Sequence, residues 1–129
     1  MVIDDKVQSK IRSVLRDIVS RVPGIEASAV ISRDGLNTAA ILGDHVDADQ
    51  LSAMCAALLG LSDTTANELQ LGHLKQVLLD GTNGLLLLVH IGKTHVLAVS
   101  ATPKVNLGLC LIESKKSAKV LSLMLISSS

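Results

Sequence analysis

Five consecutive aliphatic residues, Leu85 to Val89, constrain the fold of this chain more than any other feature of its sequence. A strand with one face in water alternates apolar and polar side chains, whereas this run is apolar at every position. Turn-forming residues bound the run at 81–84 and 92–94. The run therefore predicts a short strand that is covered by helices on both of its faces.

Four further strands are expected around this run. It forms the middle of a three-strand meander, with strands at 74–80, 85–91 and 95–101. Asp34-Gly35 separates two more apolar segments and is typical of a hairpin with a type I′ turn, because both turn residues then need positive φ. Together the five strands predict an antiparallel sheet with helices on both faces.

Two amphipathic helices are expected near the ends of the chain. In the first, apolar residues recur every three or four positions over 7–22, after the capping candidates Asp4 and Asp5. The other starts near Val105, and one side of it carries Leu107, Leu111, Ala118, Leu121 and Leu125. The chain thus reads as one α/β domain of the α+β kind over residues 1–126, with a frayed tail at 127–129.

The central helix, expected from Asp47 or Asp49 to about Gln70, carries more apolar surface than one packed face needs. A helix that packs once shows an apolar stripe of about 100°, whereas this stripe covers roughly 200° of the circumference. Its members are Leu51, Met54, Cys55, Ala57, Leu58, Leu59, Leu61 and Leu69. Packing of one face against a sheet does not account for the width of this apolar stripe.

The composition excludes one class of ligand and reveals an uneven charge distribution. None of the 129 residues is Phe, Tyr or Trp, although nearly half are hydrophobic, so the core must be aliphatic. Single-stranded nucleic acid is not an expected ligand, since its bases stack on aromatic side chains. The formal net charge is zero, yet residues 34–73 contain six acidic residues and no Lys or Arg. Such asymmetry bears on association rather than on the fold.

No catalytic, cofactor or metal site is expected. Gly92-Lys93-Thr94 resembles the end of a phosphate-binding loop, but Leu87 stands where that motif requires glycine. A strand rather than a helix is also expected to follow, so a β-turn is the better interpretation. His90 and His95 could face each other across this turn and form a weak metal site, although the sequence has no zinc-ligand spacing.

Several features indicate a cytoplasmic protein without stable membrane insertion. Cys55 and Cys110 are isolated in apolar stretches and are expected to be buried, reduced thiols. The first residues lack the order of a secretory signal, and no apolar run approaches the roughly 20 residues that cross a bilayer. The first and last helices are basic, which fits either a solvated face or a surface for acidic protein or anionic membrane.

Five stretches of the chain together carry a resemblance to a known family. They are Val22-Pro23-Gly24-Ile25, Ser32-Arg33-Asp34-Gly35-Leu36, Ala48-Asp49-Gln50-Leu51-Ser52-Ala53-Met54, Lys75-Gln76-Val77-Leu78-Leu79 and Asn106-Leu107-Gly108-Leu109. In their order and spacing, the chain resembles the Roadblock family. Members of that family include a dynein light chain, lysosomal scaffold subunits and a bacterial GTPase-activating protein.

The resemblance implies a sheet in strand order 2-1-5-4-3, with the central helix on one face and the other two helices on the opposite face. It also implies a homodimer or a heterodimer with a related subunit, in which central helices pack side by side and third strands pair across the two-fold axis. The expected interface residues are Leu51, Met54, Cys55, Leu58, Leu61, Leu74, Gln76 and Leu78. A second chain would cover the surplus apolar surface of the central helix.

Family members bind or regulate Ras-like small GTPases, so the resemblance implies a non-enzymatic scaffold or regulator of such a GTPase. The central helix has no Lys or Arg, and any stimulation of hydrolysis would come from ordering groups of the GTPase itself. Its acidic residues Asp49, Asp63 and Glu68 are expected to face the partner and to steer a basic patch.

Two other functions stay open. One is a structural adaptor that joins larger assemblies without sensing nucleotide, in the manner of a dynein light chain. The other is a small-molecule sensor, which needs a pocket with convergent polar groups. The expected strands offer almost none beyond Gln76 and Ser100.

Overall fold

The computed structural model describes the backbone of residues 3–128 and the side chains of residues 3–126. Its elements, in chain order, are α1 (Asp5–Arg21), β1 (Ile25–Ser32), β2 (Asn37–Ile41), α2 (Ala48–Glu68), β3 (Val77–Gly81), β4 (Gly84–Ile91), β5 (His95–Ala101) and α3 (Leu107–Ser128). The expected order of helix, hairpin, helix, meander and helix is confirmed. The helix α3 extends beyond the expected domain end at 126, and Ser129 lies outside the described residues.

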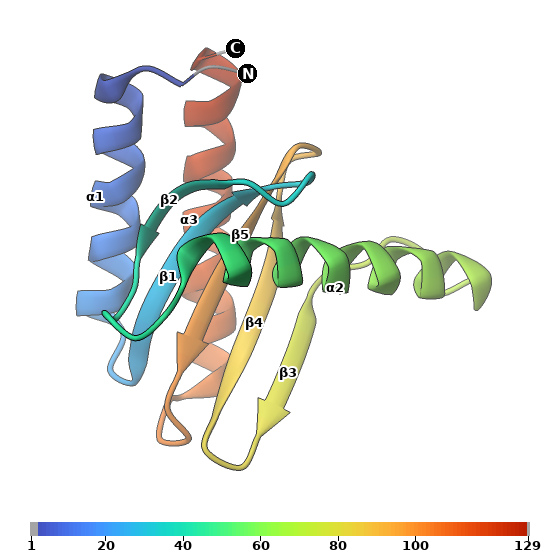
Figure 1. The fold of residues 1–129 in the computed structure, drawn as a ribbon. Helices are drawn as coiled ribbons and strands as arrows, with labels where there is room; N and C mark the ends of the chain where they lie inside the picture. The colour runs from blue at the N-terminus through green and yellow to red at the C-terminus, as the bar shows by residue number, and fades with distance from the viewer. Residues whose placement is uncertain (1–2, 129) are drawn as a thin grey trace.

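The five strands form one antiparallel sheet in the order β2-β1-β5-β4-β3, as expected. Figure 1 shows α2 crossing one face of this sheet, while α1 and α3 lie on the other face. The start of α1 and the end of α3 lie at the same end of the domain. The domain therefore has three layers, with the sheet in the middle.

Side-chain caps set the first turn of each helix. The Asp4 carboxylate accepts a hydrogen bond from the Val7 N–H at 2.8 Å, and Asp47 accepts from the N–H groups of Asp49 and Gln50 at 3.0 and 3.2 Å. The Asn106 side chain accepts from the Leu109 N–H at 3.0 Å, so α3 begins two residues later than the expected start at 105.

The type I′ turn expected at Asp34-Gly35 is wrong. Gln70 is the only non-glycine residue with positive φ in the described part of the chain, so Asp34 does not have the conformation that such a turn requires. Instead, the Gly35 N–H donates to the Ser32 carbonyl at 3.0 Å and the Ser32 N–H donates to the Leu36 carbonyl at 2.9 Å. This closes a three-residue loop, held further by the Ser32 hydroxyl, which bonds to the Asp34 carboxylate and accepts from the Leu36 N–H.

The third strand is shorter than expected. Pairing with β4 begins at Val77, opposite Leu88, and residues 74–76 approach the sheet without joining it. Because β4 continues to Ile91 against β5, its outer edge is left uncovered by a strand over its last residues. Leu74 and Gln76 therefore precede β3 and are not part of it.

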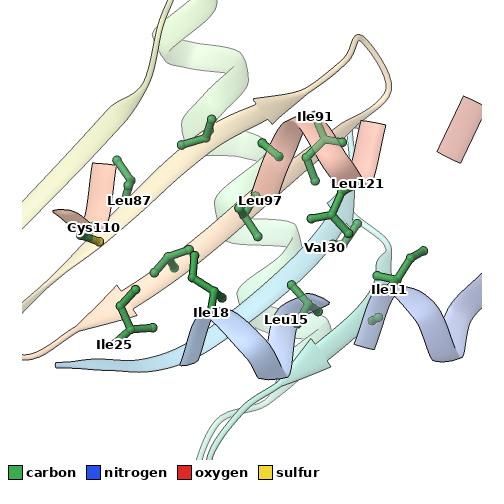
Figure 2. Close-up of a cluster of buried hydrophobic side chains, with 14 of the residues drawn as sticks. Ile11, Leu15, Ile18, Ile25, Val30, Leu87, Ile91, Leu97, Cys110 and Leu121 are labelled. Atoms are coloured by element: carbon green, nitrogen blue, oxygen red, sulfur yellow. The ribbon is translucent and has the colours of Figure 1, made fainter. Parts of the chain in front are cut away.

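Two aliphatic clusters fill the spaces on either side of the sheet. The larger lies under α1 and α3, and Figure 2 shows Ile11, Leu15 and Ile18 of α1 pointing towards the sheet there. The smaller lies under α2 and includes Cys55 and Leu59. In β4, Leu87 and Val89 belong to the first cluster and Leu88 to the second, so the strand predicted to be covered on both faces is confirmed.

The buried side of α3 differs from the expected one at its start. Leu107 was expected to face the core, but it is exposed because it occupies the first helical position, beyond the end of the sheet contacts. Cys110, Ser114, Ala118, Leu121 and Leu125 form the buried side instead. Both cysteines are buried and free, as expected.

Leu15→Ala is expected to lower the free energy of unfolding by about 2–5 kcal/mol, because it removes a fully buried side chain and leaves a cavity between α1 and the sheet. Urea unfolding followed by circular dichroism measures this loss. Leu36→Ala is the matched control, since this side chain is 66% exposed. The free energy of unfolding of the Leu36→Ala chain should stay within about 0.5 kcal/mol of the wild-type value. Equal losses for the two variants would contradict the assigned core.

Candidate functional site

The outer side of α2 presents apolar side chains to solvent. The helix packs Cys55 and Leu59 against the sheet, while Met54 is 56% exposed and Leu61 is 68% exposed. Ala57 is also exposed between these two residues, and the three positions follow helical spacing along one ridge. The surplus apolar surface predicted for this helix is therefore present in the folded chain.

The strand β3 lies at one edge of the sheet, on the side towards which the C-terminal part of α2 extends (Figure 1). Leu79 pairs with Leu86, which packs in the cluster under α2, whereas Leu78 pairs with Leu87 of the opposite cluster. Leu79 is exposed, so apolar surface continues from the helix side of the molecule to this edge. We call Met54, Ala57, Leu61 and Leu79, with the free edge of β3, the α2–β3 surface.

The residues expected at a dimer interface divide into four groups. Met54 and Leu61 lie on the α2–β3 surface, while Leu51, Leu58 and Leu74 are half-buried and pack against the cluster under α2. Cys55 is 1% exposed in the single chain, so its assignment to the interface is corrected: the thiol packs inside the subunit. Gln76 and Leu78 lie close to the edge strand, where Leu78 is directed to the α1 and α3 side.

The side-chain amide of Gln76 is not fully hydrogen-bonded in the single chain. Its Oε1 atom is buried and has no hydrogen-bond partner among the described residues. A buried amide oxygen without a donor costs free energy, and native structures contain few such groups. This residue stands just before the free edge of β3, where another strand would bring N–H donors.

The three acidic residues of α2 do not play one common role. Asp49 and Glu68 are exposed near opposite ends of the helix, as expected for groups that face a partner. Asp63 instead forms a salt bridge with Arg33 at 2.8 Å, and its other oxygen lies 3.5 Å from His90 Nε2. Arg33 thus balances the charge of Asp63, and the expectation that Asp63 faces a partner stays a prediction.

This contact links three separate elements. Arg33 belongs to the loop between β1 and β2, Asp63 to α2 and His90 to β4. The sequence offered no local signal for it, since 30 positions separate Arg33 from Asp63. The expectation that His90 and His95 could face each other is also wrong: Ile91 pairs with His95, and His90 lies on the α2 side of the sheet.

The structure also contains a polar cavity that the sequence did not indicate. It has a volume of about 390 Å³ and lies between the start of α1 and the loops that follow β1 and β4. Its polar lining includes Gln8, Asp34, Asn37, Thr94 and His95. These residues come from distant parts of the chain, so only the fold brings them together.

The described side chains give little support for metal binding, thiol reactivity or a phosphate-binding loop. Within residues 3–126, no group of three or more His, Cys, Asp or Glu residues could hold a metal ion. Burial raises the pKa of both Cys55 and Cys110, which disfavours the reactive thiolate. Gly92-Lys93-Thr94 forms the turn between β4 and β5, as expected. Across the described residues, no helix is both long enough and apolar enough to cross a membrane.

Residues 13–101 match the family described as "Roadblock/LC7 domain", which is more than half of the chain. The chain belongs to the Roadblock/LC7 domain family. Among known relatives, it is 36% identical to "Uncharacterized protein MJ0714" of Methanocaldococcus jannaschii, over 92% of this chain and 98% of the relative.

Solved structures agree with this assignment. The Roadblock/LC7 domain from Streptomyces avermitilis superposes with a TM-score of 0.83 at 23% identity, covering 88% of this chain and 96% of that one. Myxococcus xanthus MglB superposes with a TM-score of 0.90 at 17% identity, covering 100% and 97% of the two chains. The α2–β3 surface therefore lies on a domain with the Roadblock/LC7 fold.

One buried group of this Roadblock domain should make its stability depend on pH. Burial lowers the pKa of His95, although nearby Asp34 opposes the shift, and Thr94 Oγ1 lies 2.7 Å from its Nδ1. The unfolded chain therefore takes up a proton first as the pH falls, and the free energy of unfolding should decrease as the pH drops below the ordinary histidine pKa of about 6.5. Urea unfolding at each pH measures this decrease.

His95→Gln should flatten this part of the pH profile, because the substituted side chain does not titrate. His73→Gln provides the control, since His73 is exposed beyond the end of α2. The assignment of this pH dependence to His95 fails if the His95 variant keeps the wild-type slope of unfolding free energy against pH, or if the His73 variant loses that slope to the same extent.

Proposed function

We propose that this chain is a dimeric, non-enzymatic scaffold or regulator of a Ras-like small GTPase in the cytoplasm. The observation that carries the proposal is the α2–β3 surface, an apolar helix ridge beside an unpaired sheet edge. Large exposed apolar areas mark interaction sites in soluble proteins. Membership of the Roadblock/LC7 domain family supports the class of partner.

A second copy, or a related Roadblock subunit, fits the α2–β3 surface in two ways. Burying a Leu or Met side chain contributes about 1.5–3 kcal/mol, and a two-fold axis buries each ridge residue twice. Pairing of two β3 edges would also satisfy backbone groups that the single sheet leaves open. The unpartnered Oε1 of Gln76, next to this edge, would gain access to donors from the second chain.

The charge of α2 supports a platform role towards the GTPase. The helix contains three acidic residues and no basic ones, so it offers no arginine to insert into a nucleotide site. With Asp63 paired to Arg33, Asp49 and Glu68 remain to attract a basic patch. Such charges act mainly on the association rate. Because α2 offers no arginine, we infer that any stimulation of hydrolysis comes from ordering groups which the GTPase already possesses.

Leu61→Asp tests the dimer. The substitution should raise the dimer dissociation constant by at least about 100-fold, because an unpaired carboxylate buried at an interface costs several kcal/mol. Sedimentation velocity over a range of concentrations measures this change. Leu36→Asp makes the same substitution at an equally exposed leucine, 66% against 68%, on the loop after β1. A Leu61→Asp chain that dimerises as tightly as the Leu36→Asp control would contradict the interface.

Binding to a purified Ras-like small GTPase tests the regulatory role. We expect the chain to prefer one nucleotide state, GTP or GDP, since a regulator must distinguish them. The paired change Asp49→Asn and Glu68→Gln should slow association, and added salt should slow the wild-type chain to a similar rate. The control removes two exposed acidic charges elsewhere, with Asp5→Asn and Glu26→Gln.

Equal binding to both nucleotide states would instead favour the structural adaptor. Association rates that change neither with salt nor with the α2 substitutions would rule out electrostatic steering by this helix. The polar cavity beside His95 gives a specific observation in favour of the small-molecule sensor. Strong thermal stabilisation by one metabolite, lost in a Gln8→Ala or Asn37→Ala chain, would support that second function.

A further inference from the structure

The two helices on the opposite face of the sheet carry a net positive charge. Together α1 and α3 contain eight Lys or Arg residues and three Asp or Glu residues, whereas α2 has three acidic residues and no basic ones. Two of the acids, Asp17 and Glu113, are bound to Arg21 at 2.7 and 2.8 Å. The exposed lysines of α3 therefore dominate the charge along this helix.

The outward side of α3 is apolar as well as basic. Ile112, Lys116, Lys119 and Leu123 follow one another at steps of four, three and four residues, so they lie along one face of the helix. Ile112 is 55% exposed and Leu123 is 63% exposed, and Val120 adds a further exposed aliphatic side chain beside them. We call these five residues the α3 stripe.

A second copy of the chain is a poor occupant for the α3 stripe. A two-fold contact through it would bring Lys116 and Lys119 of both copies together, and like charges at an interface oppose association. The occupant must therefore offer negative charge as well as an apolar medium. A lipid surface with anionic headgroups offers both over a wide area.

We propose that the α3 stripe docks this domain on anionic lipid bilayers. The 22-residue helix is about 33 Å long and can lie in the plane of the interface. Ile112, Val120 and Leu123 enter the boundary between headgroups and acyl chains, while the long stems of Lys116 and Lys119 let their ammonium groups reach the phosphates.

The form of the surface favours a bilayer over an acidic protein. The pocket beside α3 lies towards β4 and includes Lys119 of the stripe with Lys75 and Lys115, whereas Ile112, Lys116, Val120 and Leu123 do not line it. The apolar members of the stripe thus lie outside this pocket on an exposed helix face, which suits a deformable lipid surface. The α2–β3 surface lies on the other face of the sheet and stays open to protein partners, so docking does not depend on the proposed GTPase role.

Co-sedimentation of the full chain with vesicles tests the proposal. Vesicles of phosphatidylglycerol and phosphatidylcholine in equal parts should retain the chain at low salt, and vesicles of phosphatidylcholine alone should not. The paired change Lys116→Gln and Lys119→Gln should weaken partitioning about thirty-fold, from the contribution of two lysines near an anionic surface. Ile112→Ser with Leu123→Ser should also weaken it, because apolar insertion is lost.

The matched control is Gln50→Glu with Asn67→Glu, two exposed positions of α2. It lowers the net charge by the same two units as the lysine variant, but on the other face, and should keep wild-type partitioning. The proposal is overturned if the wild-type chain fails to bind anionic vesicles, or if the control loses as much binding as the lysine variant. Wild-type binding to soluble polyglutamate but not to vesicles would assign the stripe to an acidic protein.

These outcomes are separate from the test of the proposed function. Dimerisation and GTPase binding of the lysine variant should match the wild-type chain, because its substitutions lie on the face away from α2. If the chain regulates a GTPase but does not bind vesicles, only the proposed docking surface is rejected.

Discussion

Burial of the central strands on both faces is the constraint from which the rest of the architecture follows. In β4 and β5, successive side chains enter opposite clusters, and no face of these strands is left for water over their middle residues. The sheet therefore needs a helical layer on each side. Since no aromatic side chain is available, both layers must fit through the shapes of smaller side chains, chiefly Leu, Ile, Val and Ala.

The two layers are unequal, and this inequality creates the candidate site. Two helices cover the larger cluster, while α2 alone covers the smaller one and crosses the strands instead of running along them (Figure 1). A single crossing helix buries one side only, so Met54 and Leu61 stay outside and become binding surface. Asp63 ties this helix to the sheet through Arg33 and His90. The opposite helical layer is basic, so the domain presents different chemistry on its two faces.

The local pattern of the sequence predicted the elements well because their causes are local. Strand β5 was predicted at its observed bounds, and the caps Asp4 and Asp47 mark where α1 and α2 begin. Errors arose where contacts outside the recognised motif decided the outcome. The Asp34-Gly35 dipeptide alone favours a two-residue turn, but the hydroxyl of Ser32 and the pairing of Leu36 stabilise a longer loop.

The amino-acid pattern alone determined an aliphatic α+β domain whose α2 has more apolar surface than one sheet can cover, because helical and strand periodicity show which sides are excluded from water. Which of those residues stay outside was set by packing in three dimensions. The fold enclosed Cys55, paired Asp63 with Arg33, and placed Gln8 and His95 around one cavity. Such juxtapositions depend on the crossing of α2 and on strand register, which bring together residues that are far apart along the chain.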